Sequence, residues 1–468
     1  MYPYLFRTKY AYFTQLNQSL PPHFLETLPD LSAEELEDFE SAQQMPPVIS
    51  LRLNPRKSGT TFDKNAVVPW CDNGRYLNER PNFTADPLLH AGAYYVQEAS
   101  SMLLDTALRQ CADWCVSHRI LDLCAAPGGK STLVASIMSA DSFLLSNEVI
   151  QSRASILAEN LSKWGQMNTW VSNSDPKQLG KLQAFFDVLI IDAPCSGSGL
   201  FRKIPSYLED WNPDFVNLCA ERQKRIFQDS YSALSQHGLL VYMTCSFSRT
   251  ENEEMLDYLM DEFEMDSVAL DIPVSWGITA TLSDRHGAHG YRCYPHKLKG
   301  EGFFLACFRK KDGSPLQEFK PVKSEIKYQE ALNPYLSIGT YAVYEHDGHL
   351  FLMHPEHLTL LKPILSHSRL IKKGILAGKM IRQDFIPDHE LALYHGLKND
   401  LPSVELDLQM AIQYLQKEVI HPVLPHKGWF LVKYHGKNLG WIKNLGNRVN
   451  NYYPVNYRIL SKNILPDA

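Results

Sequence analysis

The sequence predicts an α/β fold whose core, over about residues 119–310, is a doubly wound parallel sheet. Continuous apolar runs alternate there with helical stretches, and such runs are typical of parallel strands that helices cover on both faces. In folds of this kind, ligands bind beyond the carboxyl ends of the strands, and the unusual residues of this chain follow those ends. The five expected strands are residues 119–124, 142–147, 169–172, 186–192 and 238–244.

The segments that flank this core have a different character. The N-terminal part begins as a helical arm, in which Ser32 and Glu35 have the spacing of a capping box, and continues from Pro46 as a small α/β module. After a last strand at residues 303–308 and a short linker, apolar stretches broken by Gly, Pro and His predict a β-rich extension. The predicted domains are residues 1–100, 101–311, 318–395 and 396–468.

Composition excludes several classes of protein. The chain has 468 residues, of which 44% are hydrophobic and 21% charged, so it is not a disordered protein. No apolar run reaches the ~18 residues of a membrane helix, and the N-terminus lacks the pattern of a secretory signal. Nine cysteines without paired spacing fit a reducing compartment. We therefore expect a cytoplasmic monomer that does not contact a membrane.

The charge is unevenly distributed along the chain. The net charge is −6, but residues 1–280 carry −14 and residues 281–468 carry +8. Eight acids and no base lie within residues 251–266, where apolar residues at helical spacing predict an outer helix with a solvated acidic face. Only the second half of the chain therefore suits contacts with phosphates.

The first motif is LDLCAAPGGKST at residues 121–132, a strand that runs into a Gly-rich turn and a helix start. Such a turn presents backbone N–H groups to a ligand. Gly129-Lys130-Ser131 matches the end of a P-loop, but Cys124 occupies the position of the first P-loop Gly and Pro127 interrupts the loop. The motif therefore predicts a ligand site without a triphosphate cradle.

Acidic residues follow the next two strands. Glu148 lies 20 positions after Gly128, a spacing that suits a carboxylate on a ribose diol. Asp175, with Asn173, follows the third strand and could accept an adenine amino group. Together these residues predict a nucleoside cofactor, and S-adenosylmethionine fits because it carries no phosphate.

Two cysteines follow the fourth and fifth strands. Cys195 lies in DAPCSGSG and Cys245 in TCS. A thiolate that adds to C6 of a pyrimidine makes C5 nucleophilic toward a sulfonium methyl group, which is covalent catalysis. Asp192, beside Cys195, could hydrogen-bond N3–H of the ring, and the second thiol could help to release the product.

These motifs, in this order and spacing, resemble those of the NOL1/NOP2/Sun RNA cytosine-5 methyltransferases. QEASS at residues 97–101, YPH at 294–296 and GEGFF at 300–304 extend the resemblance over about residues 46–310. It implies a Rossmann-like class I S-adenosylmethionine-dependent methyltransferase core, with Cys245 as nucleophile, Cys195 in product release and Asp192 beside the base. The implied cofactor-binding positions are Cys124, Ala125, Ala126, Pro127, Gly128, Gly129, Lys130, Glu148, Asp175 and Asp192. Arg153 matches a helical Arg near the cofactor, and Lys130 could contact the substrate or Asp192 instead.

Three stretches of the C-terminal part, GWFL at residues 428–431, LGWIK at 439–443 and GNRVNNYYP at 446–454, resemble those of the bacterial branch that methylates 16S rRNA. The resemblance implies a small RNA-recognition module near the N-terminus and a PUA-like RNA-binding domain over residues 396–468. In that domain cations alternate with aromatic rings, which suits a folded RNA. The cations are Lys433, Lys437, Lys443 and Arg448, and the rings are Trp429, Tyr434, Trp441 and Tyr452.

We therefore expect a 5-methylcytosine methyltransferase that acts on 16S rRNA, either as naked RNA or within the 30S subunit. Two alternatives are a tRNA cytosine-5 methyltransferase and a non-catalytic RNA-binding ribosome-assembly factor. A small-molecule or protein methyltransferase leaves the two thiols unexplained. No Cys/His cluster has zinc spacing, so we expect no metal and read His389 and His421 as surface residues. Arg202 and Lys203 could hold an RNA phosphate or form a solvated loop.

Overall fold

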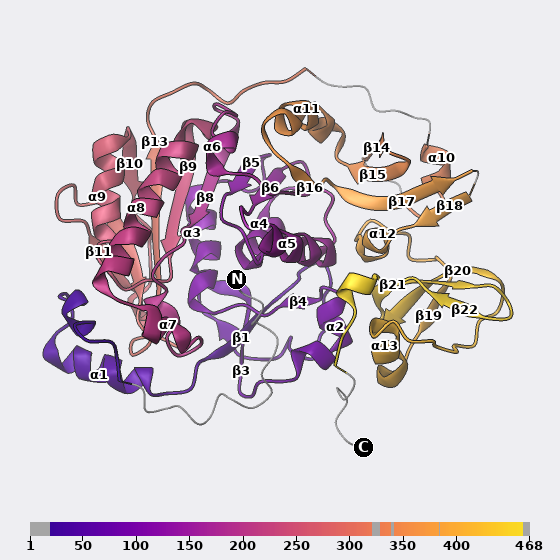
Figure 1. Ribbon diagram of the computed structural model, residues 1–468, viewed down its shortest axis with the longest axis horizontal. Helices are drawn as coiled ribbons and strands as arrows, with labels where there is room; N and C mark the ends of the chain where they lie inside the picture. The colour runs from indigo at the N-terminus through magenta and orange to yellow at the C-terminus, as the bar shows by residue number, and fades with distance from the viewer. Residues whose placement is uncertain (1–18, 321–327, 338–340, 383, 462–468) are drawn as a thin grey trace.

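The computed structural model describes residues 19–320, 328–337, 341–382 and 384–461. Within these residues the chain forms one large central sheet and three smaller, four-stranded sheets (Figure 1). The strand order of the central sheet is β11-β12-β13-β9-β8-β5-β6-β7-β16, with β10 paired to β13. None of the described helices is both long and apolar enough to cross a membrane.

The five expected strands form the middle of the central sheet and are mutually parallel. They are β7 (Thr169–Ser172), β6 (Phe143–Asn147), β5 (Arg119–Asp122), β8 (Phe186–Asp192) and β9 (Leu234–Thr244). The chain leaves β5 toward β6 and later returns on its other side as β8, so the strand order reverses at β5. A reversal of this kind opens a crevice at the carboxyl ends of the strands.

Both faces of the parallel strands are buried, as their continuous apolar sequences predict. In β8, Leu189 and Ile191 belong to the hydrophobic cluster on one face, and Val188 and Ile190 belong to the cluster on the other. The helices that supply these clusters or flank the strands are α3 (Leu103–Cys111), α4 (Gly129–Ile137), α5 (Gln151–Trp164), α6 (Pro176–Leu179), α8 (Pro213–Ser230) and α9 (Glu253–Glu262).

The sheet is not parallel throughout, so the expectation of a parallel sheet is wrong at its edges. β13 (Phe303–Lys310) pairs antiparallel with β9, and β16 (Leu370–Lys372) pairs antiparallel with β7. Antiparallel strands need no crossover helix, and only short loops and one 3₁₀ turn lie between the edge strands after α9. These strands are β10 (Met265–Val268), β11 (Thr279–Leu282) and β12 (His289–Cys293).

The N-terminal part forms a helix and a small sheet, as expected. Ser32 caps α1 (Ala33–Gln43) in a complete capping box with Glu35. Residues 1–18, where the helical arm was expected to begin, lie outside the described residues. The short helix α7 (Ser206–Asp210) belongs to a later part of the chain, between β8 and α8. The strand order of the small N-terminal sheet is β2-β3-β1-β4. Its elements are β1 (Ile49–Leu53), β2 (Val67–Val68), β3 (Cys71–Leu77), α2 (Pro87–His90) and β4 (Tyr94–Tyr95).

The C-terminal part forms two further sheets beside α5 (Figure 1). It is anchored there by Glu390, whose carboxylate accepts hydrogen bonds from Ser162 of α5 (2.6 Å) and from the buried Lys372 ammonium (2.7 Å). The first sheet contains β14 (Ala342–His346), β15 (His349–Met353), β17 (Ile375–Ile381) and β18 (Asp384–Pro387). The second contains β19 (Ser403–Glu405), β20 (Gly428–Tyr434), β21 (Lys437–Asn444) and β22 (Val449–Asn451). The helices are α10 (Gln329–Leu332), α11 (Leu358–His367), α12 (His389–Leu393) and α13 (Leu408–Leu415).

Candidate active site

The Gly-rich turn connects β5 to α4 and is held from behind by α5. Gly128 has φ 113°, which favours glycine, and a Cβ there would lie 3.2 Å from Leu157 Cδ1. The Arg153 guanidinium donates to the carbonyl of Ala126 (2.8 Å), and Asn160 donates to that of Pro127 (2.8 Å). The turn, which spans Cys124 to Lys130, is therefore fixed at the start of α4, where backbone N–H groups are free for a ligand.

Glu148 follows β6 and is buried, with only 4% of its surface exposed. One carboxylate oxygen accepts the backbone N–H of Ile150 (2.9 Å), and the other lies 3.3 Å from the Arg153 guanidinium. Burial raises the pKa of nearby Asp122 to about 7, and Asp192 and Glu148 add to this shift by repulsion. Asp122 Oδ2 accepts from Ser131, whereas its buried Oδ1 has no partner. Sequence reasoning did not single out Asp122.

Asp175 is exposed and caps α6, with its Oδ1 accepting the backbone N–H of Lys177 (2.9 Å). Its Oδ2 has no hydrogen-bond partner among the described residues. Asn173 uses its amide N–H groups internally, on the carbonyls of Glu148 (2.7 Å) and Val149 (2.9 Å). The ends of β6 and β7 are thereby tied together next to Glu148.

The two cysteines singled out in the sequence meet at the carboxyl ends of β8 and β9. Their Sγ atoms lie 3.0 Å apart, and the backbone N–H of Cys245 donates to Cys195 Sγ (3.3 Å). Both side chains are half-buried. Contact with Cys245 and burial raise the pKa of the Cys195 thiol well above its usual value, with a further contribution from Glu251. Cys195 therefore holds its proton at neutral pH.

Lys130 and Asp192 form an ion pair at the same edge of the sheet. The Lys130 ammonium lies 2.6 Å from Asp192 Oδ2 and 5.3 Å from the centre of the Phe303 ring. Burial lowers the pKa of Lys130, but Asp192 outweighs this effect, with help from Cys245, so the pKa is raised overall. The pair joins the Gly-rich turn to the segment that carries Cys195.

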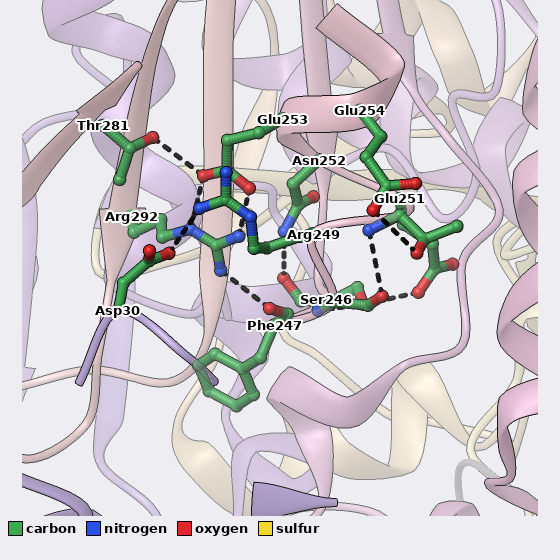
Figure 2. A network of polar contacts seen from close by, with 12 residues as sticks. Asp30, Ser246, Phe247, Arg249, Glu251, Asn252, Glu253, Glu254, Thr281 and Arg292 are labelled. Carbon is green, nitrogen blue, oxygen red and sulfur yellow. Dashed lines mark hydrogen bonds and ion pairs between the residues drawn. The ribbon is translucent and has the colours of Figure 1, made fainter. Parts of the chain in front are cut away.

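Glu251 is a buried carboxylate that the sequence analysis missed. It receives hydrogen bonds from Ser196 and Ser246, the residues that follow the two cysteines, and Figure 2 shows it beside Ser246. The prediction of a solvated acidic face over residues 251–266 is wrong here and at Glu253 and Asp257, which are also buried. Glu253 is paired with the buried Arg292 guanidinium, and Asp257 accepts two backbone N–H groups. The signal in the sequence was the position of these acids directly after the TCS motif.

Two other expectations from the sequence need correction. The Arg202 guanidinium is buried in an ion pair with Glu301 (2.8 Å), so it is not available to bind an RNA phosphate. His389 is buried against Tyr453 and is no surface residue. In the described part of the chain no three His, Cys, Asp or Glu side chains are grouped to hold a metal ion.

The proposed aromatic RNA surface of the C-terminal part is only partly exposed. Trp441 is 2% exposed and donates its indole N–H to the carbonyl of Asp388 (2.8 Å), so it is a core residue. Trp429 stays half-exposed, with the Lys443 ammonium 5.1 Å from the centre of its ring. Both rings lie on the same face of the β20–β21 pair, with their centres 6.5 Å apart, but Trp429 stands at the start of β20 and Trp441 in the middle of β21, a difference that the spacing alone did not reveal.

Three family models match successive parts of the chain. Residues 20–99 match the N-terminal domain of 16S rRNA methyltransferase RsmF, residues 114–309 match 16S rRNA methyltransferase RsmB/F, and residues 401–459 match the methyltransferase RsmF PUA domain. Among solved structures, a methyltransferase homologue from Pyrococcus horikoshii is 28% identical, with a TM-score of 0.53 over 63% of this chain and 96% of that one. NSun6 from the same organism, at 18% identity and a TM-score of 0.52, covers 63% of this chain and 99% of its own and shares the fold.

Curated relatives match the chain over nearly its whole length. Ribosomal RNA small subunit methyltransferase F of Aeromonas salmonicida is 30% identical over 94% of this chain and 97% of its own. The protein of the same name from Erwinia tasmaniensis is 29% identical over 93% of this chain and 96% of its own. The chain therefore has a Rossmann-like core between an RsmF N-terminal domain and an RsmF PUA domain, and its relatives match it over nearly their whole length. It belongs to the 16S rRNA methyltransferase RsmF family.

Proposed function

We propose that this protein transfers a methyl group from S-adenosylmethionine to C5 of cytosine in 16S rRNA, through a covalent bond between Cys245 and C6. The observation that carries the proposal is the pair of thiols 3.0 Å apart, at the ends of adjacent strands. The Lys130–Asp192 ion pair connects this pair to the Gly-rich turn. A protein that only binds RNA has no use for two thiols in this place.

The residues around the turn suit S-adenosylmethionine by their charge. Asp122, Glu148 and Asp192 repel one another, and the buried Oδ1 of Asp122 has no partner, so a cationic ligand is favoured there. S-adenosylmethionine carries a sulfonium and an ammonium group and needs no phosphate cradle. We assign the ribose to Glu148, the adenine amino group to Asp175 Oδ2, and the rest of the cofactor to the turn from Cys124 to Lys130. When bound, the cofactor supplies an electrophilic methyl group.

The residues of the chain then have separate roles. Cys245 Sγ bonds to C6 of the cytosine, which makes C5 nucleophilic. Asp192, held by Lys130, faces N3 of the ring and favours its protonated, more electrophilic form. C5 then forms the bond to the methyl group, and the cofactor would leave as S-adenosylhomocysteine. Water takes the proton of C5, the electron pair of that C–H bond re-forms the C5–C6 double bond, and the bond between Sγ and C6 breaks, so that 5-methylcytosine and the Cys245 thiolate separate. Cys195, which keeps its proton, is next to the departing thiolate.

Replacing Glu148 with Gln is expected to weaken cofactor binding by about 10- to 100-fold, because a hydrogen bond to a charged group contributes roughly 1.5–3 kcal/mol. Isothermal titration with S-adenosylmethionine measures this change. Glu159→Gln is the matched control, because Glu159 lies on the following helix, α5, where it pairs with Lys163 (2.5 Å). A Kd that stays unchanged in Glu148→Gln, with an unchanged melting temperature, would contradict the assignment of the ribose.

The choice of 16S rRNA rests on the names of the relatives. Bisulfite sequencing of rRNA and tRNA from cells that lack the protein tests it, because the lost 5-methylcytosine identifies the substrate. Loss from tRNA alone would favour the tRNA alternative. Full complementation by a Cys245→Ala variant would favour an assembly factor that needs no catalysis.

The C-terminal part offers one exposed ring for an unpaired base. Trp429 lines a cavity of about 420 Å³, and neither its indole N–H nor the hydroxyl of Tyr335 has a hydrogen-bond partner among the described residues. Lys398 and Lys443 lie beside the cavity and the ring. Aromatic rings next to cations are what single-stranded RNA segments bind.

Trp429→Ala is therefore expected to weaken binding of 16S rRNA by about 10-fold or more, since one stacked base contributes roughly 1–3 kcal/mol. Filter binding at several salt concentrations measures the effect, and the affinity of both proteins should fall as salt rises. The control is Val423→Ala, at an exposed position outside the cavity. Equal affinities of Trp429→Ala and the control would remove the ring from the RNA-binding surface.

A further inference from the structure

Glu251 joins the two segments that carry the thiols. Its Oε1 accepts the backbone N–H of Ser196 (2.8 Å) and the side-chain amide of Gln223 (3.2 Å). Its Oε2 accepts the hydroxyl groups of Ser196 and Ser246. Ser196 directly follows Cys195 and Ser246 directly follows Cys245, so one carboxylate sets the distance between the two loops.

The pattern of donors favours the ionised form of this carboxylate. The backbone N–H of Ser196 and the amide of Gln223 can only donate, and the Ser246 hydroxyl, which accepts the backbone N–H of Ser248 (3.1 Å), donates to Glu251. Glu251 is fully buried, and burial raises its pKa, but these hydrogen bonds oppose the shift. A buried carboxylate with this many donors is most stable as the anion.

The charge of Glu251 acts on Cys195. On the side of Cys195 it disfavours a second negative charge, as it also does at Tyr242 and Cys219. On the side of Cys245 the Lys130 ammonium is the facing cation. Other charged groups act on these neighbours of the pair: Asp122 and Asp192 act on Lys130, Arg222 on Cys219, and Glu253 on Tyr242.

We propose that Glu251 is the positioning residue of the thiol pair: it holds the two cysteine loops in register, and its charge keeps the proton on Cys195. This inference rests on the proposed function for its meaning in catalysis, since it leaves a protonated thiol beside the proposed nucleophile. It concerns a residue that touches neither the base nor the cofactor in the proposed mechanism.

The test is alkylation of the full-length protein with iodoacetamide as a function of pH, followed by mass spectrometry of the peptides that contain each cysteine. Only thiolates react, so the pH at which Cys195 is modified reports where its proton is lost. In Glu251→Gln, Cys195 is expected to react at lower pH than in the unchanged protein, because a nearby negative charge is gone. Glu254→Gln, at an exposed position of the same segment, should leave the profile unchanged.

Activity provides the second readout. Glu251→Gln is expected to lower kcat by about 10- to 100-fold while KM for S-adenosylmethionine stays the same, since the reacting atoms lose their alignment. Glu251→Asp keeps the charge but not the reach, so it should keep the alkylation profile and still lose kcat. If Glu251→Gln does not fold, two other proteins test the same contacts. One is Glu251→Asp, and the other is the double variant Ser196→Ala with Ser246→Ala.

The outcomes separate this inference from the proposed function. An unchanged alkylation profile in Glu251→Gln overturns the action of Glu251 on the Cys195 proton, and an unchanged kcat in both Glu251 variants overturns the positioning role. If the unchanged protein methylates no cytosine, the proposed function fails, yet a shifted profile in Glu251→Gln still supports the action of Glu251 on the thiols.

Discussion

Cys245→Ala is expected to abolish methylation of 16S rRNA, with a loss of at least about 10⁴-fold in kcat. Without Sγ no bond to C6 forms, so C5 of cytosine stays too weak a nucleophile to take the methyl group. Incorporation of labelled methyl groups from S-adenosylmethionine into 16S rRNA measures the loss. Binding of S-adenosylmethionine should change little, because the groups assigned to it lie on the turn after β5 and at the end of β6.

The matched control is Cys115→Ala, which removes an exposed thiol. It should retain full activity. Turnover by Cys245→Ala above the level of a reaction without enzyme would exclude Cys245 as the nucleophile. If Cys195→Ala also lost its activity, Cys195 would be the nucleophile and Cys245 would act in product release.

Cys195→Ala is expected to accumulate a covalent complex between protein and RNA. The Cys195 thiol lies 3.0 Å from Cys245 Sγ and keeps its proton, so it can stabilise the departing thiolate when the bond to C6 breaks. Without it, the bond should form but break slowly. The complex is measured as a band of reduced mobility on a denaturing gel after incubation with 16S rRNA and S-adenosylmethionine.

The double variant Cys195→Ala with Cys245→Ala serves as the control, because it lacks the sulfur that bonds to the base. Its lane should show no such band. A band that persists in the double variant would mean that another residue bonds to RNA, and the absence of a band in Cys195→Ala, with rapid turnover, would remove Cys195 from product release.

The middle of the fold was predictable because its signals are local. Strands β7 and β8 have the bounds expected from their apolar runs, and the capping box at Ser32 is formed as expected. The edge strands were not predictable in the same way. Whether β13 runs parallel or antiparallel to β9 depends on the path of the chain between them, and β16 reaches β7 from a segment about 200 residues further along.

The exposure of side chains was the least predictable property. Trp429 and Trp441 look alike in the sequence, but only Trp429 is open to solvent, because Trp441 points into the core and binds Asp388. The sequence suggested that Arg202 could bind RNA, but the fold places Glu301 beside it, and the two side chains form a buried ion pair.

The sequence by itself determined which residues are the candidates for the proposed chemistry. The Gly-rich turn, Glu148, Asp192, Cys195 and Cys245 stand in short motifs at predicted strand ends, and parallel strands bring such ends to one edge. Only the tertiary structure decided how they meet. The contacts between the two thiols, between Lys130 and Asp192, and between Glu251 and Ser196 join residues 50, 62 and 55 positions apart. The strand order creates these contacts, and burial then sets which groups hold a charge or a proton.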